Sequence, residues 1–191
     1  MTTATETLRR EHDVILRMLD ATDEVIRRLN NGDRIEPGTL NGLLEFFRLF
    51  ADQCHHGKEE DLLFPKLQQK GMPREAGPIG VMLLEHDQGR AFVRQMAQAA
   101  EEYAKGSPGA AARWTAAAAG YTALLREHIY KENNILFVMA ERMLTPEEQD
   151  ELARQFEKVE VEKMGAGTHE RLHALMDQLT AELSKEKAAA R

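Results

Sequence analysis

The 191-residue sequence is poor in several residue types, and each shortage narrows the class of protein. Cys54 is the one cysteine, which excludes an intrachain disulfide and a zinc site built on several thiolates. Valine and isoleucine are sparse and no run alternates apolar with polar residues, which argues against β-sheet. The sequence has neither a run of about 18 apolar residues, the length that spans a membrane, nor a secretory signal at its start. We therefore expect an all-α, cytoplasmic protein.

Basic residues are outnumbered by acidic ones. The chain has 25 lysines and arginines against 32 aspartates and glutamates, a formal net charge of −7, and the two kinds are interspersed. An acidic chain without a basic stripe is poorly suited to bind nucleic acid or an anionic membrane surface. We expect no nucleic acid and no membrane among its partners.

Helix-forming residues, by contrast, are abundant, and glycine and proline divide them into segments. These breaks predict six helices, over residues 4–30, 37–70, 79–105, 108–143, 146–163 and 168–184. The first four are long and joined by short connections, which favours an up-down-up-down four-helix bundle. We assign residues 1–145 to this bundle and residues 146–191 to two additional C-terminal helices that pack on it and end in a frayed tail.

Three of the long helices carry an apolar seam that a histidine interrupts. His12 stands on the seam of the first helix and His86 on that of the third, where positions alternate in steps of four and three residues. On the fourth helix His128 and Glu132 interrupt the seam together. Such seams face the interior of a bundle, so these polar side chains are expected inside.

An internal repeat relates the two halves of the predicted bundle. The tripeptide Glu-His-Asp at residues 11–13 recurs 74 residues later, at residues 85–87. The pattern His-x-x-Lys-Glu-x-x-x-Leu-Phe at residues 55–64 recurs 73 residues later, at residues 128–137. Each half therefore carries a histidine on its first helix and His-x-x-x-Glu on its second.

This repeat places metal-binding side chains together. Histidine and glutamate four residues apart lie on one helix face, and the distances of the four histidines from their turns put them at one height. Burying two carboxylates among apolar residues costs several kcal/mol each unless a cation compensates. The sequence therefore predicts a pair of metal ions, iron in the first place, with manganese or zinc as alternatives. The predicted ligands are His12, His55, Glu59, His86, His128 and Glu132.

These motifs resemble the hemerythrin-like family, the HHE cation-binding domains. The resemblance is carried by residues 11–12, 55–65, 85–86 and 128–137, and it covers residues 8–144. It implies a non-haem di-iron centre, oxo- or hydroxo-bridged, whose carboxylates bridge the two irons and which handles oxygen, peroxide, nitric oxide or iron. Carried over residue by residue, it places the ligands on the same six positions.

Two positions near this set need separate treatment. The repeat pairs His55 with His128, so the neighbouring His56 corresponds to Ile129. His56 is either a flanking residue or an additional metal ligand, as the residue after this histidine is in an iron-sensing member of the family. Oxygen-carrying members have a second histidine four residues after the third-helix one, where this sequence has Arg90. This departure argues against a reversible oxygen carrier.

Other residues are candidates for the pocket or for a second site. Tyr121 lies seven residues before His128 on the same seam, so it either lines the metal pocket with Arg90 or fills the core. Cys54 adjoins His55 and is either a pocket residue or a small buried apolar one. His169 and His173, four residues apart on the last helix, lack partner histidines nearby, which favours a capped surface helix over a second metal site.

Three functions fit these residues. The first is binding or sensing of oxygen or a related small molecule, namely nitric oxide or peroxide. The second is an enzyme that disproportionates or reduces peroxide at the same centre. The third is an iron-responsive or structural metal-binding protein. One ligand set serves all three, so the sequence leaves open whether the protein is an enzyme and whether it has a protein partner.

Overall fold

The computed structural model describes residues 2–165 and 167–189, and within these ranges the chain is helical and contains no strand. The first helix, α1 (Ala4–Asn30), has the bounds expected from the sequence. Thr3 caps it: its side chain accepts a hydrogen bond from the Glu6 backbone N–H, and the Glu6 carboxylate accepts one from the Thr3 N–H. This capping box fixes the start of the helix.

The second and fourth long helices each change winding along their length. In chain order the second comprises α2 (Pro37–Phe46), the π-helical segments η1 (Phe47–His56) and η2 (Glu59–Leu63), and α3 (Phe64–Gln69). The fourth comprises α5 (Ala110–Lys131), the π-helical segment η3 (Glu132–Leu136) and α6 (Phe137–Met143). A π-turn closes its hydrogen bond over five residues and is wider than an α-turn, and such turns occur frequently at functional sites.

The remaining helices follow the predictions with shifted ends. They are α4 (Gly77–Ala104), α7 (Pro146–Met164) and α8 (Thr168–Ala189). The fourth long helix begins at Ala110 because Gly109 takes a left-handed conformation, with φ 73°, that ends the preceding turn. α8 continues beyond the expected end at Ser184, through a stretch of Lys, Glu and Ala that favours helix. The rest of the predicted frayed tail, residues 190–191, lies outside the described residues.

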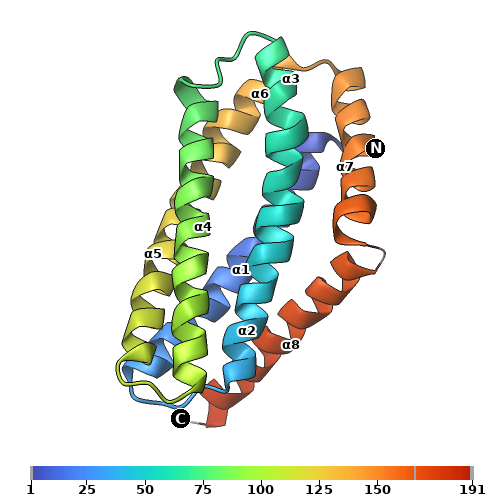
Figure 1. Ribbon diagram of the computed structural model, residues 1–191. Coiled ribbons are helices and arrows are strands. Elements are labelled where there is room, and N and C mark those ends of the chain that lie inside the picture. Colours follow the sequence, from blue (N-terminus) through green and yellow to red (C-terminus); the bar gives the residue numbers. More distant parts are fainter. Residues whose placement is uncertain (1, 166, 190–191) are drawn as a thin grey trace.

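Four long helical stretches lie side by side, and α7 and α8 run along one flank of them (Figure 1). α4 and α5 pack closely because Gly120 has no side chain: a Cβ there would lie 2.5 Å from the Phe92 ring. None of the described helices combines the length and the apolarity that crossing a membrane requires.

Two apolar clusters fill the interior, one on each side of a polar layer. The larger cluster includes Phe46, Trp114 and Tyr121, and Leu172 of α8 joins it. The smaller includes Phe64 and Phe137 together with Phe156 of α7. Both C-terminal helices thus take part in the core. The buried polar residues of the layer between the clusters are His12, His55, His56, Glu59, His86, His128 and Glu132.

Candidate metal centre

The six side chains predicted as ligands meet in this layer, and none is more than 1% exposed. Glu132 is central to one part: its Oε2 lies 3.1 Å from His12 Nε2 and 3.2 Å from His128 Nε2. Glu59 is central to the other, with its Oε1 3.7 Å from His55 Nε2 and its Oε2 3.4 Å from His86 Nε2. Side chains from all four long helices therefore converge on the two carboxylates.

The potential ligand atoms form two groups, each with its atoms within 4.8 Å of one another. The first metal group is His12, His55, Glu59 and Glu132, and the second metal group is His56, Glu59, His86 and His128. Glu59 belongs to both, so it lies between two positions that could each hold an ion. The His86 and His128 Nε2 atoms are 3.2 Å apart, a spacing that suits two nitrogens each about 2.1 Å from one ion.

His56 lies in the second metal group rather than beside it. The residue is 4% exposed, and its ring stacks on the His86 ring, with centroids 3.8 Å apart and planes 16° from parallel. Successive residues of an α-helix diverge by about 100°, which would turn one of two adjacent histidines away. η1 ends at His56, and its wider turns reduce that divergence. The π-helix thus lets His55 face the first group while His56 faces the second.

Every imidazole of the layer is held at its outer nitrogen. The Nδ1 atoms contact acceptors as follows: His12 to Asn133 at 2.9 Å, His55 to Glu11 at 2.8 Å, His56 to Asp52 at 3.4 Å, His86 to Glu60 at 2.6 Å and His128 to Glu85 at 3.0 Å. An Nδ1–H that donates to such an acceptor leaves the Nε2 lone pair facing inward. That is how metal-binding histidines are oriented in proteins.

Two of these acceptors, Glu11 and Glu85, also bind a lysine, and the internal repeat relates the two pairs. Lys58 Nζ binds Glu11, and Lys131 Nζ binds Glu85. Burial opposes ionisation of Glu11, but the hydrogen bond from His55 and the charge of Lys58 hold its pKa at about 2. Sequence reasoning gave these residues no role. The signal was present, because each glutamate directly precedes a predicted ligand and each lysine directly precedes a predicted glutamate ligand in the repeated motifs.

The inward-facing atoms are left without hydrogen bonds. Among the described residues, His12 Nε2, His55 Nε2 and both carboxylate oxygens of Glu59 and Glu132 are buried and have no hydrogen-bond partner. Such a set is costly unless an ion joins it, because a buried polar group without a partner loses its hydration uncompensated. The donor set therefore fits a pair of metal ions, which would satisfy all of these atoms at once.

The pKa values of Glu59 and Glu132 also favour a pair of metal ions at this place. Burial and the neighbouring Glu132 carboxylate raise the pKa of Glu59 well above its usual range. Burial also disfavours ionised Glu132, but the charge of His128 and the contact with His12 outweigh it and lower its pKa. Burial lowers the pKa of His128, yet the charge of the nearby Glu132 carboxylate and the hydrogen bond to Glu85 raise it to about 9. Protein groups alone thus compensate one carboxylate, whereas a cation pair would compensate both.

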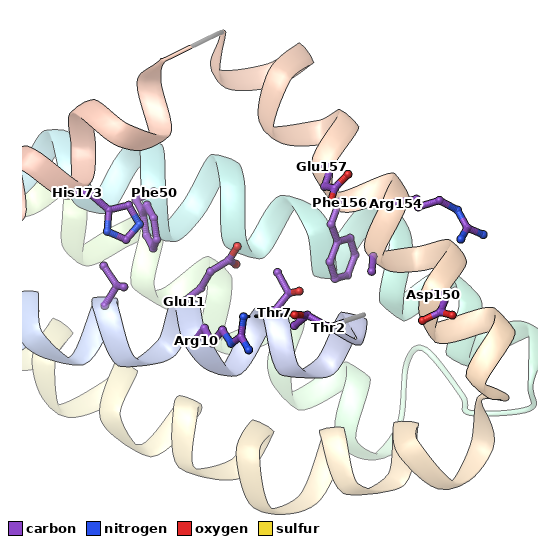
Figure 2. A pocket seen from close by; sticks show the side chains of 12 residues that line it. Thr2, Thr7, Arg10, Glu11, Phe50, Asp150, Arg154, Phe156, Glu157 and His173 are labelled. Atoms are coloured by element: carbon purple, nitrogen blue, oxygen red, sulfur yellow. Dashed lines mark hydrogen bonds between the residues drawn. The ribbon is translucent and has the colours of Figure 1, made fainter.

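A cavity opens near each metal group. The larger, about 470 Å³, lies between α1 and the C-terminal helices, and Figure 2 shows Glu11, Phe50, Phe156 and His173 around it. The smaller, about 200 Å³, is lined by His56 of the second metal group. Glu11 separates the larger cavity from His55, whereas the smaller cavity touches a potential ligand directly.

The other candidates from the sequence fall in different places. Tyr121 and Arg90 both line the smaller cavity with His56. Cys54 is buried and is in neither metal group. The ring of His173 meets that of Phe50 edge-on at 5.5 Å, whereas the side chain of His169 lies outside the described residues.

Comparison with known proteins places the chain in a family. The family model described as the hemerythrin HHE cation binding domain matches residues 3–140. An uncharacterized protein of Mycobacterium tuberculosis is 29% identical over 163 residues, which cover 85% of this chain and 63% of that protein. The iron-sulfur cluster repair protein YtfE of Salmonella schwarzengrund is 33% identical over 140 residues, which cover 69% of this chain and 61% of that protein.

The chain thus spans less than two thirds of the length of these curated relatives. No solved structure matches it significantly. The family match covers most of the chain and includes all the histidines and glutamates of the two metal groups. The chain belongs to the hemerythrin HHE cation-binding domain family.

Proposed function

We propose that the chain is a non-haem di-iron protein that binds or senses oxygen or a related small molecule, nitric oxide or peroxide. One observation carries the proposal: two groups of buried imidazole and carboxylate atoms share Glu59, and most of these atoms lack any hydrogen-bond partner. Mixed imidazole and carboxylate ligands suit iron, with manganese or zinc as alternatives. The scaffold in this proposal is an up-down-up-down bundle over residues 1–145, extended by residues 146–191.

Each side chain has a role in this proposal. His12, His55 and Glu132 would hold one ion, His56, His86 and His128 would hold the other, and Glu59 would be available to both. Iron held by these residues would supply reversible redox chemistry and would bind the small molecule. The chain itself fixes the imidazole orientation through the Nδ1 acceptors, and the two apolar clusters keep bulk water from the layer.

The position of Arg90 bears on the kind of small molecule handled. Its guanidinium points to carboxylates rather than to the layer, with contacts of 2.8 Å to Asp52, 2.7 Å to Glu60 and 3.1 Å to Asp87. The third imidazole of the second metal group comes instead from His56, on another helix. The second ion therefore has different surroundings from those in oxygen-carrying hemerythrins, which supports sensing or turnover rather than reversible oxygen transport.

The proposal is tested by metal analysis and by absorption spectroscopy of the purified chain. We expect about two irons per chain and a metal-centred absorption that changes when the protein is reduced without oxygen and then exposed to oxygen or nitric oxide. Stoichiometric zinc, or an absorption that neither gas alters, would overturn the proposal.

Peroxide turnover at the same centre is a second candidate. It is favoured by the cavity that brings the Tyr121 ring and the His56 imidazole to one space, where peroxide can approach the second metal group. Oxygen evolution after addition of peroxide measures this activity. It should disappear in Glu59→Ala and in Glu132→Ala and persist in Glu127→Ala, which alters an exposed glutamate on the helix that carries His128. A metal-loaded protein that evolves no oxygen would exclude this candidate.

A further inference from the structure

Of the two cavities described above, only the smaller connects the surface directly with a metal group. At about 200 Å³, it has room for a ligand of a few non-hydrogen atoms. Its wall combines the Phe47 and Tyr121 rings with the charged residues Arg48, Asp52, Arg90 and Arg94. His56 forms its inner end toward the second metal group.

The charges around this cavity are mainly positive, in a chain of net charge −7. Three guanidinium groups face one carboxylate along its wall. Arg90 is neutralised by Asp52, Glu60 and Asp87. Arg48 and Arg94 are exposed, and neither has an ion pair or hydrogen bond among the described residues. These two side chains therefore leave uncompensated positive charge at the mouth.

The larger cavity lacks this excess, which makes it a useful contrast. Arg10 and Arg154 line it, but so do three carboxylates, those of Glu11, Asp150 and Glu157 (Figure 2). Positive charge without matching carboxylates is thus specific to the cavity at the second metal group. A cleft that is lined by charges of one sign and has walls of low dielectric constant focuses the electric field. It thereby raises the local concentration of ions of opposite sign.

Tyr121 supplies a hydrogen-bond donor inside the same cavity. Its side chain is 2% exposed, and the hydroxyl has no hydrogen bond among the described residues. Phe47 holds the ring edge-on with centroids 4.7 Å apart, and Gly89 of the facing helix lies against the ring, where a Cβ would make an ordinary contact of 3.5 Å with Tyr121 Cε2. The phenol is fixed in place and borders the cavity, so its hydroxyl is available to donate to a ligand there.

We propose that this cavity admits a small monoanion and holds it beside the second metal group, with Arg48 and Arg94 attracting it and the Tyr121 hydroxyl donating a hydrogen bond to it. The ligand is an anion because a neutral diatomic molecule gains little from two guanidinium charges. The inference rests on the proposed function for the ion at the inner end of the cavity. The charged mouth exists without that ion.

Azide is a suitable probe, titrated into the metal-loaded full-length chain and followed by the metal-centred absorption. Replacing both mouth arginines, Arg48→Gln with Arg94→Gln, should raise the azide Kd about tenfold at low ionic strength, and the difference should shrink in high salt. The matched control, Arg74→Gln with Arg142→Gln, removes the same charge from exposed positions outside the cavity and should leave the Kd unchanged. Nitric oxide, which is neutral, should bind the mouth variant as it binds the parent.

Tyr121→Phe keeps the ring and removes the donor. It should raise the azide Kd about tenfold in low and in high salt alike, because the loss is a hydrogen bond to a charged ligand rather than long-range attraction. An azide Kd that neither the mouth variant nor Tyr121→Phe changes would overturn the inference.

A second readout does not depend on the metal. Phenylglyoxal modifies arginines, and mass spectrometry locates the modified positions. Azide should protect Arg48 and Arg94 from modification while Arg74 and Arg142 react as before. Protection in a chain without metal would support the inference even if the di-iron proposal failed. Equal reaction at all four arginines would contradict it even if the di-iron centre proved correct.

Discussion

The Glu11–Lys58 ion pair lies buried under α7, whereas its counterpart in the repeat, Glu85–Lys131, reaches the surface. The Lys58 side chain is 0% exposed and that of Lys131 is 30% exposed. Phe156 of α7 accounts for part of this difference, since its ring lies 5.9 Å from Lys58 Nζ. One motif therefore lies in two environments, and the C-terminal helices cover only the side of the first metal group.

The second metal group has surroundings that the internal repeat does not reproduce. It has His56 where the repeat has Ile129, and Glu60 where the repeat has Asn133. These replacements bring an extra imidazole, the Arg90 network and a cavity to the second metal group. The contrast teaches that a duplicated scaffold can keep two potential ion positions while the smaller cavity touches a potential ligand of only one of them.

Removing the carboxylate that both metal groups share should have the largest effect. Glu59→Ala takes a potential ligand from each group, so we expect both ions to be lost, where a single-group variant such as His12→Ala should lose mainly one. Elemental analysis of the purified variants measures this. Glu127→Ala, an exposed glutamate, should keep the parental metal content. Two ions retained in Glu59→Ala would show that the groups do not share it.

Lys58→Met and Lys131→Met compare directly the ion pair that α7 covers and its partly exposed counterpart. Lys58→Met leaves the buried Glu11 carboxylate without its cation and should lower the free energy of unfolding by about 3–5 kcal/mol. Lys131→Met breaks a partly exposed pair and should cost less than about 1 kcal/mol. Urea unfolding followed by circular dichroism, with both variants equally metal-loaded, gives the two values. Similar losses would mean that burial under α7 does not distinguish the pairs.

His56→Ile gives the first half of the repeat the residue that the second half has at the equivalent position, Ile129. We expect the affinity for the second ion to fall about 10- to 100-fold, with the first ion unaffected, because one of the three imidazoles of the second group is gone. Competition with a chelator, followed by metal analysis, resolves the two ions. If both are retained as tightly as in the parent, His56 is a flanking residue.

The sequence brought out six of the seven residues of the polar layer because the signal that marks them is periodic. His12, His86 and His128 interrupt apolar seams, and the repeat identified His55 and Glu59 as counterparts of His128 and Glu132. The structure brings all six side chains together. The helix bounds follow mainly from glycine and proline with small shifts, whereas the end of α8, which has no such breaker, was placed several residues too early.

The position of His56 could not be settled in the same way. Its direction depends on the winding of η1, and π-helical winding is imposed by packing against other helices rather than by local propensity. Asn133, Glu60 and Asp52 were missed for a related reason. They differ between the repeats, so the internal comparison that found the central residues could not reveal them.

The first metal group has a consequence for the topology of the chain. Its residues run from His12 to Glu132, so an ion held there closes a loop over most of the described sequence. Cross-links that close long loops reduce the entropy of the unfolded chain most. A protein whose single cysteine rules out an internal disulfide would thus have a removable equivalent, and one that can form only after Glu132 has been synthesised. Metal supply during synthesis would then decide when the N-terminal helix becomes tied to the rest of the chain.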